Sequence, residues 1–105
     1  MIKIGIVLPF YGGNSYLNRL ISSLGIEDGQ FSKILYIIDN SLESEKCDVK
    51  YSNHTNISII DAGIGIGYGK ACNIGFNKCK DDNCDYVIVV NQDGYFAPNS
   101  LNLMI

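Results

Sequence analysis

Short runs of apolar, β-branched residues recur along the chain, separated by polar or glycine-rich stretches. The four runs cover residues 3–9, 33–39, 57–61 and 86–90. Each is short enough to predict a β-strand rather than a helix. The last run, from Tyr86 to Val90, contains no charged residue, which predicts a strand buried on both faces, as in a parallel sheet. Pro9 is expected to end the first strand, because proline cannot donate to a central ladder.

A helix is predicted between the first two strands. Its apolar face is formed at positions i, i+3, i+4 and i+7 by Leu17, Leu20, Ile21 and Leu24. Asn14 or Ser15 can cap the first turn, since both side chains accept a hydrogen bond from a backbone N–H. Gly25 is well placed to end the helix, because glycine readily takes the left-handed conformation of a C-cap.

A second helix is predicted over residues 70–78, just before the fourth strand. Its apolar face would be formed by Cys72, Phe76 and Cys79. Residues 42–56 are polar and predict a loop or a short irregular helix, in which His54 would be solvated. Pro98-Asn99-Ser100 is expected to begin a last helix over residues 101–105.

Strands that alternate with helices predict an α/β fold with a mainly parallel sheet. With right-handed crossovers we expect the strand order 3-2-1-4, whose switch point lies between the first and fourth strands. Ligands of such sheets bind outside the carboxyl ends of the strands. Asp39 and Asp93 follow the second and fourth strands, so they should share one edge with the turn after Pro9.

The composition narrows the class of protein. The chain has 105 residues, 47% apolar and 18% charged, which fits one globular domain over residues 1–105. Its net charge of -3 and scattered lysines argue against a nucleic-acid partner. No signal peptide or membrane-spanning run is evident, so we expect a cytoplasmic protein. Without a secretory context, the four cysteines are expected to be reduced thiols, although a structural metal is an alternative.

Four alternating glycines, Gly63, Gly65, Gly67 and Gly69, precede Lys70 and the second helix. They do not have the spacing of a dinucleotide fingerprint, and the residue after Lys70 is not the serine or threonine of a P-loop. One interpretation is a flexible turn. The other is a bare backbone that a ligand can approach, next to a helix N-terminus whose N–H groups suit an anion.

The two carboxylates at strand ends also allow two interpretations. Asp93, followed by Gly94, is either a turn residue or an oxygen ligand for magnesium or manganese. Asp39 is either a turn residue or a hydrogen-bond acceptor for a nucleobase or ribose. Both carboxylates are expected at the same edge of the sheet. This shared position favours ligand binding over a turn-forming role for each of them.

Four short motifs are more specific together than any of them alone. They are Val7-Leu8-Pro9-Phe10-Tyr11, Ile37-Ile38-Asp39-Asn40-Ser41, the stretch from Gly67 to Gly75, and Asn91-Gln92-Asp93. In order and spacing they resemble the N-terminal half of family 2 glycosyltransferases, in particular the rhamnosyltransferase-like branch that makes bacterial surface polysaccharides. The resemblance implies the three-layer, Rossmann-like half of the A-type glycosyltransferase fold. It also implies inverting transfer from a nucleotide-diphosphate sugar to a saccharide or lipid-linked saccharide.

The resemblance assigns roles to individual positions. The turn Pro9-Phe10-Tyr11 would border the nucleobase, and Asp39 with Asn40 would bind the base or the ribose. The sugar donor would be lined by Gly67, Gly69, Lys70 and Asn73. Asp93 would be the last residue of the family's D-x-D motif and would hold a divalent magnesium or manganese ion at the diphosphate.

This sequence departs from the family pattern at two positions. The first aspartate of the D-x-D motif is Asn91, so metal binding would depend on Asp93. The arginine that many members carry before Asn73 is Cys72, which leaves Lys70 as the nearest cation for the phosphates.

The resemblance covers only the donor-binding half of the family. We therefore expect a truncated chain without an acceptor site or a general base, whose longer parent could work at the inner face of the membrane. A nucleotidyltransferase is one alternative, since its first half is similar. Another is a non-catalytic binding or assembly module, which could form a homodimer through uncovered apolar surface.

Overall fold

The computed structural model describes residues 2–26 and 31–91. Its strands are β1 (Lys3–Phe10), β2 (Ser32–Asp39), β3 (Ile57–Asp61) and β4 (Tyr86–Val89), and its α-helices are α1 (Asn14–Leu24) and α2 (Tyr68–Asp81). Two short 3-10 helices, η1 (Glu43–Glu45) and η2 (Val49–Asn53), lie in the predicted loop between β2 and β3. The expected helix at 101–105 and the candidate metal ligand Asp93 lie outside the described residues.

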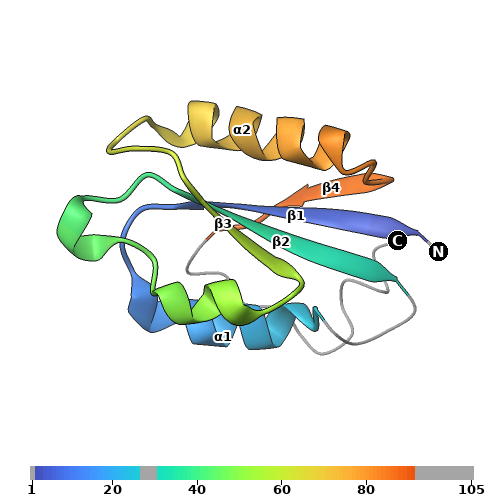
Figure 1. Cartoon of the computed structure of the whole chain (residues 1–105), viewed down its shortest axis with the longest axis horizontal. Coiled ribbons are helices and arrows are strands. Elements are labelled where there is room, and N and C mark those ends of the chain that lie inside the picture. The colour runs from blue at the N-terminus through green and yellow to red at the C-terminus, as the bar shows by residue number, and fades with distance from the viewer. Residues whose placement is uncertain (1, 27–30, 92–105) are drawn as a thin grey trace.

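The four strands form one parallel sheet in the order β3-β2-β1-β4. α1 packs on one face of this sheet and α2 on the other (Figure 1). The α/β class, the parallel sheet and the predicted strand order are thereby confirmed. The three layers match those of the Rossmann-like half of the A-type glycosyltransferase fold.

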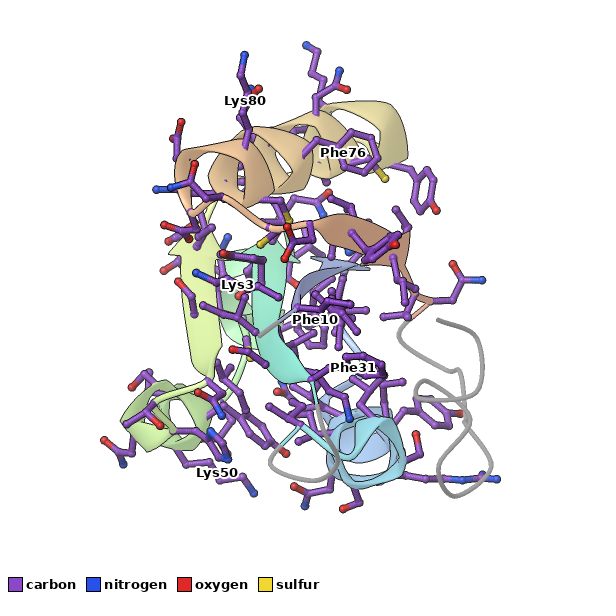
Figure 2. The ribbon with its side chains drawn as sticks, turned by 90° about the vertical axis from the view of Figure 1, so that its right-hand side faces the viewer. Lys3, Phe10, Phe31, Lys50, Phe76 and Lys80 are labelled. Atoms are coloured by element: carbon purple, nitrogen blue, oxygen red, sulfur yellow. The ribbon has the colours of Figure 1, made fainter. Side chains whose placement is uncertain are left out.

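β1 is the centre of the core, because its successive side chains point to opposite faces of the sheet. Its residues Ile4, Ile6, Leu8 and Phe10 pack with Leu17, Leu20 and Leu24 of α1. Phe10 lies between the sheet and α1 and is fully buried (Figure 2). On the other face, Val7 packs with Tyr36 and Ile38 of β2 and with Ala71 and Cys79 of α2.

Pro9 does not end the first strand, which continues to Phe10. The carbonyl oxygens of Lys3 and Val7 accept hydrogen bonds from the β4 side, from Asp85 N and Val90 N. Backbone groups of alternate β1 residues face the same neighbouring strand, so the position of the missing Pro9 N–H also faces the β4 side. β4 ends at Val89, which pairs with Val7. Proline is tolerated here because it removes no bond from either ladder.

The prediction that the fourth strand is buried on both faces is wrong. Tyr86, Val87 and Val89 are 36–49% exposed, although Val90 just beyond the strand is buried. The reason is that β4 has a hydrogen-bonded neighbour on one side only within the described sheet. An apolar run therefore indicated a strand correctly but overestimated its burial.

Two details of the helices also differ from the prediction. α1 begins after Gly13 without a side-chain cap, because the Asn14 amide instead donates to Lys46 O and accepts from Asp48 N. α2 is longer than predicted at both ends, and it buries Gly75 while Phe76 is 42% exposed. The helix thus faces the sheet with its small residues rather than with its aromatic one. The Gly25 cap of α1, in the left-handed conformation, is confirmed.

Candidate functional site

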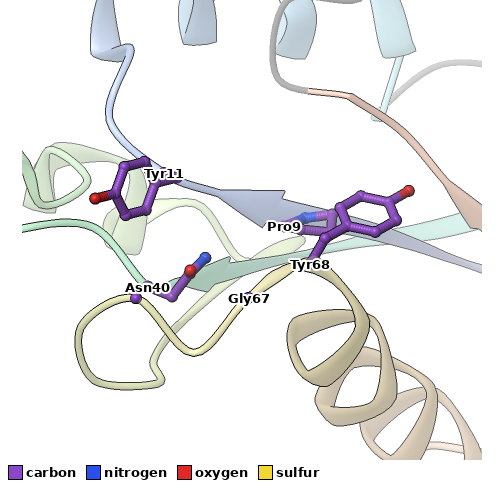
Figure 3. A pocket seen from close by; sticks show the side chains of 6 residues that line it. Pro9, Tyr11, Asn40, Gly67 and Tyr68 are labelled. Carbon is purple, nitrogen blue, oxygen red and sulfur yellow. The ribbon is translucent and has the colours of Figure 1, made fainter.

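A pocket of about 370 Å³ lies at the carboxyl ends of β1 and β2, beside the N-terminus of α2. Its lining residues, shown in Figure 3, are Pro9, Tyr11, Asn40, Gly65, Gly67 and Tyr68. They come from the three segments that carry the first three sequence motifs. The structure therefore brings these three segments together at one edge of the sheet. The turn after Pro9 and the end of the second strand share this edge as predicted, whereas Asp93 lies outside the described residues.

The turn after β1 contributes alternate residues to the pocket. Pro9 and Tyr11 line it, and Tyr11 is 50% exposed. Phe10 points the other way, into the core against α1. Of the predicted Pro9-Phe10-Tyr11 border, Phe10 therefore supports the site only through packing.

Asn40 lines the pocket and is held rigidly at the end of β2. Its side-chain amide and its backbone N–H both donate to the carbonyl oxygen of Phe10, over 2.9 and 3.0 Å. Its own carbonyl oxygen accepts a hydrogen bond from Gly65 N, over 2.8 Å. One residue thereby joins the turn after β1 to the glycine-rich loop before α2.

Asp39 adjoins the pocket, but its carboxylate is directed into the following loop. One carboxylate oxygen accepts from Ser41 N over 3.0 Å, and the other accepts from Cys47 N over 2.7 Å. The residue is 2% exposed. Ser41 in turn accepts a hydrogen bond from Gly12 N through its hydroxyl, over 2.7 Å. Asp39 thus organises the loop that positions Asn40; its contact with a nucleobase or ribose stays a prediction.

The glycine-rich loop forms the wall of the pocket opposite Tyr11. Gly63, Gly65 and Gly67 have φ values of 94°, 61° and 92°, which favour glycine over residues with a side chain. A Cβ at any of the three would meet no atom within 4 Å, so the backbone conformation rather than crowding requires glycine.

Lys46 holds this loop from the other side. Its ammonium group donates to Gly63 O over 2.7 Å and to the Asp61 carboxylate over 3.0 Å. The Gly63 N–H also donates to Asp61, and together with Lys46 it lowers the pKa of that carboxyl group. Nothing in the sequence pattern singled out Lys46, because its partners are distant in the chain and meet it only in the fold.

The N-terminus of α2 opens toward the pocket. Gly67 caps it without a side-chain hydrogen bond, so the backbone N–H groups of the first turn have no side-chain acceptor there. Lys70 in this turn and Asn73 in the next are both exposed, and no acidic residue is present in the first turn. This arrangement favours an anionic ligand by backbone donors and charge together.

Tyr68, the first residue of α2, was not among the predicted site residues. It lines the pocket and is 60% exposed. A hydrogen bond with the neighbouring Cys72 thiol raises the pKa of the Tyr68 phenol. An aromatic residue directly after a glycine loop, at the first position of a helix, is the signal that could have identified it.

The described residues contain no group of three or more histidine, cysteine, aspartate or glutamate side chains that could hold a metal ion. Asn91 is the last described residue and is exposed. The proposed metal ligand, Asp93, lies beyond it. The metal site at Asp93 therefore stays a prediction.

The profile of glycosyl transferase family 2 matches residues 5–105. The chain belongs to glycosyl transferase family 2. Members of this family use nucleotide sugars as donors, which agrees with a pocket at the carboxyl edge of a parallel sheet. No curated protein matches the chain. None of the described helices is long and apolar enough to cross a membrane.

Replacing Gly69 with alanine is expected to have opposite effects on the stability of the domain and on its affinity for a nucleotide. Gly69 lies inside α2 without a positive φ, and a Cβ there would meet no protein atom within 4 Å. We expect the unfolding free energy to rise by about 0.4–1 kcal/mol, as for glycine to alanine where the native backbone conformation suits both residues. If a donor phosphate approaches this backbone, nucleotide affinity should fall at the same time. Urea unfolding and calorimetric titration measure the two effects; a stabilised variant with unchanged affinity would remove Gly69 from the site.

Proposed function

We propose that the pocket binds the nucleoside of a nucleotide-diphosphate sugar, as the donor site of a glycosyltransferase. The observation that supports this most directly is the pairing of two exposed tyrosines, Tyr11 and Tyr68, with a side-chain-free glycine wall. The volume of about 370 Å³ is within the range of small-molecule sites. Aromatic rings stabilise a planar base by stacking, and a bare backbone allows ribose and phosphate to approach closely.

The diphosphate would lie over the N-terminus of α2. Its negative charge would be stabilised by backbone N–H groups of the first turn and by Lys70, with Gly67 and Gly69 allowing close approach. Asn73, one turn further along the helix, would contact the donor beyond the phosphates. Asn40 would contact the nucleoside, and Asp39 would act on it through the loop that holds Asn40 in place.

A divalent magnesium or manganese ion held by Asp93 is part of this proposal. Such an ion, when bound, supplies positive charge to a leaving nucleoside diphosphate. The remaining donor stabilisation comes from this chain's own backbone donors and Lys70. Because Asn91 is an amide, we expect only one carboxylate of the motif to hold the ion.

The specific reaction we propose is inverting transfer to a saccharide or lipid-linked saccharide, in a rhamnosyltransferase-like pathway for bacterial surface polysaccharide. The reaction would take place in the cytoplasm, at the inner face of the membrane. The chain of 105 residues would by itself bind the donor without turning it over.

A second candidate is an assembly module that uses the same fold. It is favoured by the exposed apolar residues Tyr86, Val87 and Val89 on β4, which could form a homodimer contact. Sedimentation velocity of the purified chain distinguishes the two. A concentration-dependent dimer supports assembly, whereas a monomer at high concentration argues against it.

The donor proposal is tested by titrating uridine, guanosine and thymidine diphosphates with and without manganese, by calorimetry. We expect one nucleotide to bind, and Tyr11→Ala to weaken it about tenfold or more, since stacking on an aromatic ring contributes about 1–3 kcal/mol per base. Tyr16→Ala is the matched control, because Tyr16 is equally exposed but lies on α1 away from the pocket.

Asp93→Ala should abolish the manganese dependence of nucleotide binding. A folded sample that binds none of the three would overturn the proposal.

A further inference from the structure

Two thiols share one space on the α2 face of the sheet. Cys79 lies in the last turns of α2, and Cys84 lies just before β4. Both sulfur atoms are within 3.0 Å of the point that a Cβ on Gly5 would occupy. Glycine in the middle of β1 therefore leaves room for both sulfur atoms, and they are close neighbours.

The backbone also brings these two residues together. Cys84 N donates to Cys79 O over 2.9 Å, across the turn that ends α2. Further bonds from Asp82 N to Lys78 O and from Asn83 N to Lys80 O fix this turn. A disulfide needs adjacent main chains and side chains that point toward the same place. The backbone hydrogen bond and the shared space at Gly5 agree with both conditions.

The two thiols differ in their surroundings. Cys79 is 1% exposed, and its burial, with the nearby Cys84 thiol, raises the pKa of Cys79 to about 12. Cys84 is only partly buried, and its sulfur lies 3.9 Å from the Tyr36 hydroxyl, which also bonds to Asp82. A reagent in solution would thus reach Cys84 first, and Cys79 would react within the protein.

We propose that Cys79 and Cys84 are a redox modification site that forms a reversible disulfide by exchange with a low-molecular-weight disulfide. The Cys84 thiolate attacks one sulfur of the reagent, which forms a mixed disulfide and releases one thiolate. The Cys79 thiolate then attacks the Cys84 sulfur and releases the second reagent thiolate. The two cysteines lose two electrons and two protons, and the reagent is reduced to two thiols.

All four cysteines are free thiols in this structure. Cys47 and Cys72 serve as a comparison within the same chain. Cys47 lies between η1 and η2, and Cys72 lies in the first half of α2. The site is also distant from the donor pocket, since Cys79 is near the opposite end of α2 from Tyr68. It therefore does not depend on the proposed function.

The test is to incubate the folded chain with oxidised glutathione at mildly alkaline pH, and to follow intact mass and tryptic peptides. We expect the wild type to lose two hydrogen atoms and to yield one linked peptide containing Cys79 and Cys84. Cys79→Ala should instead retain one glutathione on Cys84. Dithiothreitol should reverse both products.

Because Cys79 is buried, its variant could fail to fold, and Cys84→Ser serves as a second test at the less buried position. This variant should form no internal disulfide under the same conditions, with circular dichroism confirming the fold. Cys47→Ser and Cys72→Ser are controls that should form the disulfide as the wild type does. A wild type that keeps its four thiols, or that accumulates glutathione on Cys84 without closing the disulfide, would overturn the proposal.

Discussion

Replacing Asp39 with alanine should lower the free energy of unfolding by about 3 kcal/mol and remove nucleotide binding at the pocket. The carboxylate is 2% exposed and accepts two backbone hydrogen bonds, from Ser41 and Cys47. Its removal leaves two buried N–H groups without an acceptor, and each costs about 1–3 kcal/mol. The loop from residue 40 to 47 would lose its anchor.

The loss of binding follows from what this loop holds in place. Asn40 joins the turn after β1 to the glycine-rich wall, and Lys46 fixes the same wall from the far side. Both are within the segment that Asp39 organises. A displaced loop would therefore disturb two sides of the pocket at once.

Asp61 offers a matched control for the effect on stability, because it is the register partner of Asp39 at the end of the neighbouring strand β3. Its side chain is 71% exposed and pairs with Lys46. Asp61→Ala should cost less than about 1 kcal/mol, as surface ion pairs usually do. Urea unfolding and nucleotide calorimetry compare the two variants. If Asp39→Ala kept wild-type stability but lost binding, Asp39 would contact the nucleotide directly instead of positioning the loop.

The sheet could be predicted in detail because the pattern and a chirality rule are sufficient for it. Alternating strands and helices with right-handed crossovers allow few strand orders, and β3-β2-β1-β4 is the one observed. The carboxyl edge of such a sheet then locates the site. The strand pattern is also sufficient to predict that Phe10 points into the core, because alternate residues of a strand share a face and Phe10 follows Ile4, Ile6 and Leu8.

The pocket's side chains could not be predicted in the same way. Asp39 and Asn40 are adjacent polar residues at one strand end, and only the loop from 40 to 47 decides which one faces the pocket. Lys46 depends on a contact with Gly63 across 17 residues. Such contacts arise from tertiary packing, which neither periodicity nor motif spacing encodes.

The predicted apolar face of α2 is correct in part. Cys72 and Cys79 are buried as predicted, whereas Phe76 is 42% exposed. Beside the two cysteines, the helix turns Ala71 and Gly75 toward the sheet, where both are buried. Hydrophobicity alone favoured the aromatic residue, but a close approach between helix and sheet requires small ones.

Gly75→Ala should therefore lower the unfolding free energy by about 2 kcal/mol, with a fall in Tm of roughly 10 °C. A Cβ at Gly75 would lie 3.1 Å from Val7 Cβ and closer still to both Val7 methyl groups. Val7 is fully buried in the central strand, and its branched side chain cannot rotate away. The clash outweighs the gain in helix propensity of about 1 kcal/mol that alanine brings.

A double-mutant cycle identifies the cause, because Val7→Ala removes the methyl groups that the new Cβ would meet. The double variant should be more stable than the sum of the two single changes predicts. Gly69→Ala, in the same helix but facing open space, is expected to be stabilising and serves as the control. If Gly75→Ala were equally stabilising, α2 would not approach β1 as closely as the structure has it. Tyr68 begins this helix, so the contact between Gly75 and Val7 also affects the position of the Tyr68 ring relative to Pro9 in the pocket. A shift of α2 in the Gly75→Ala variant should therefore weaken nucleotide binding as well as stability.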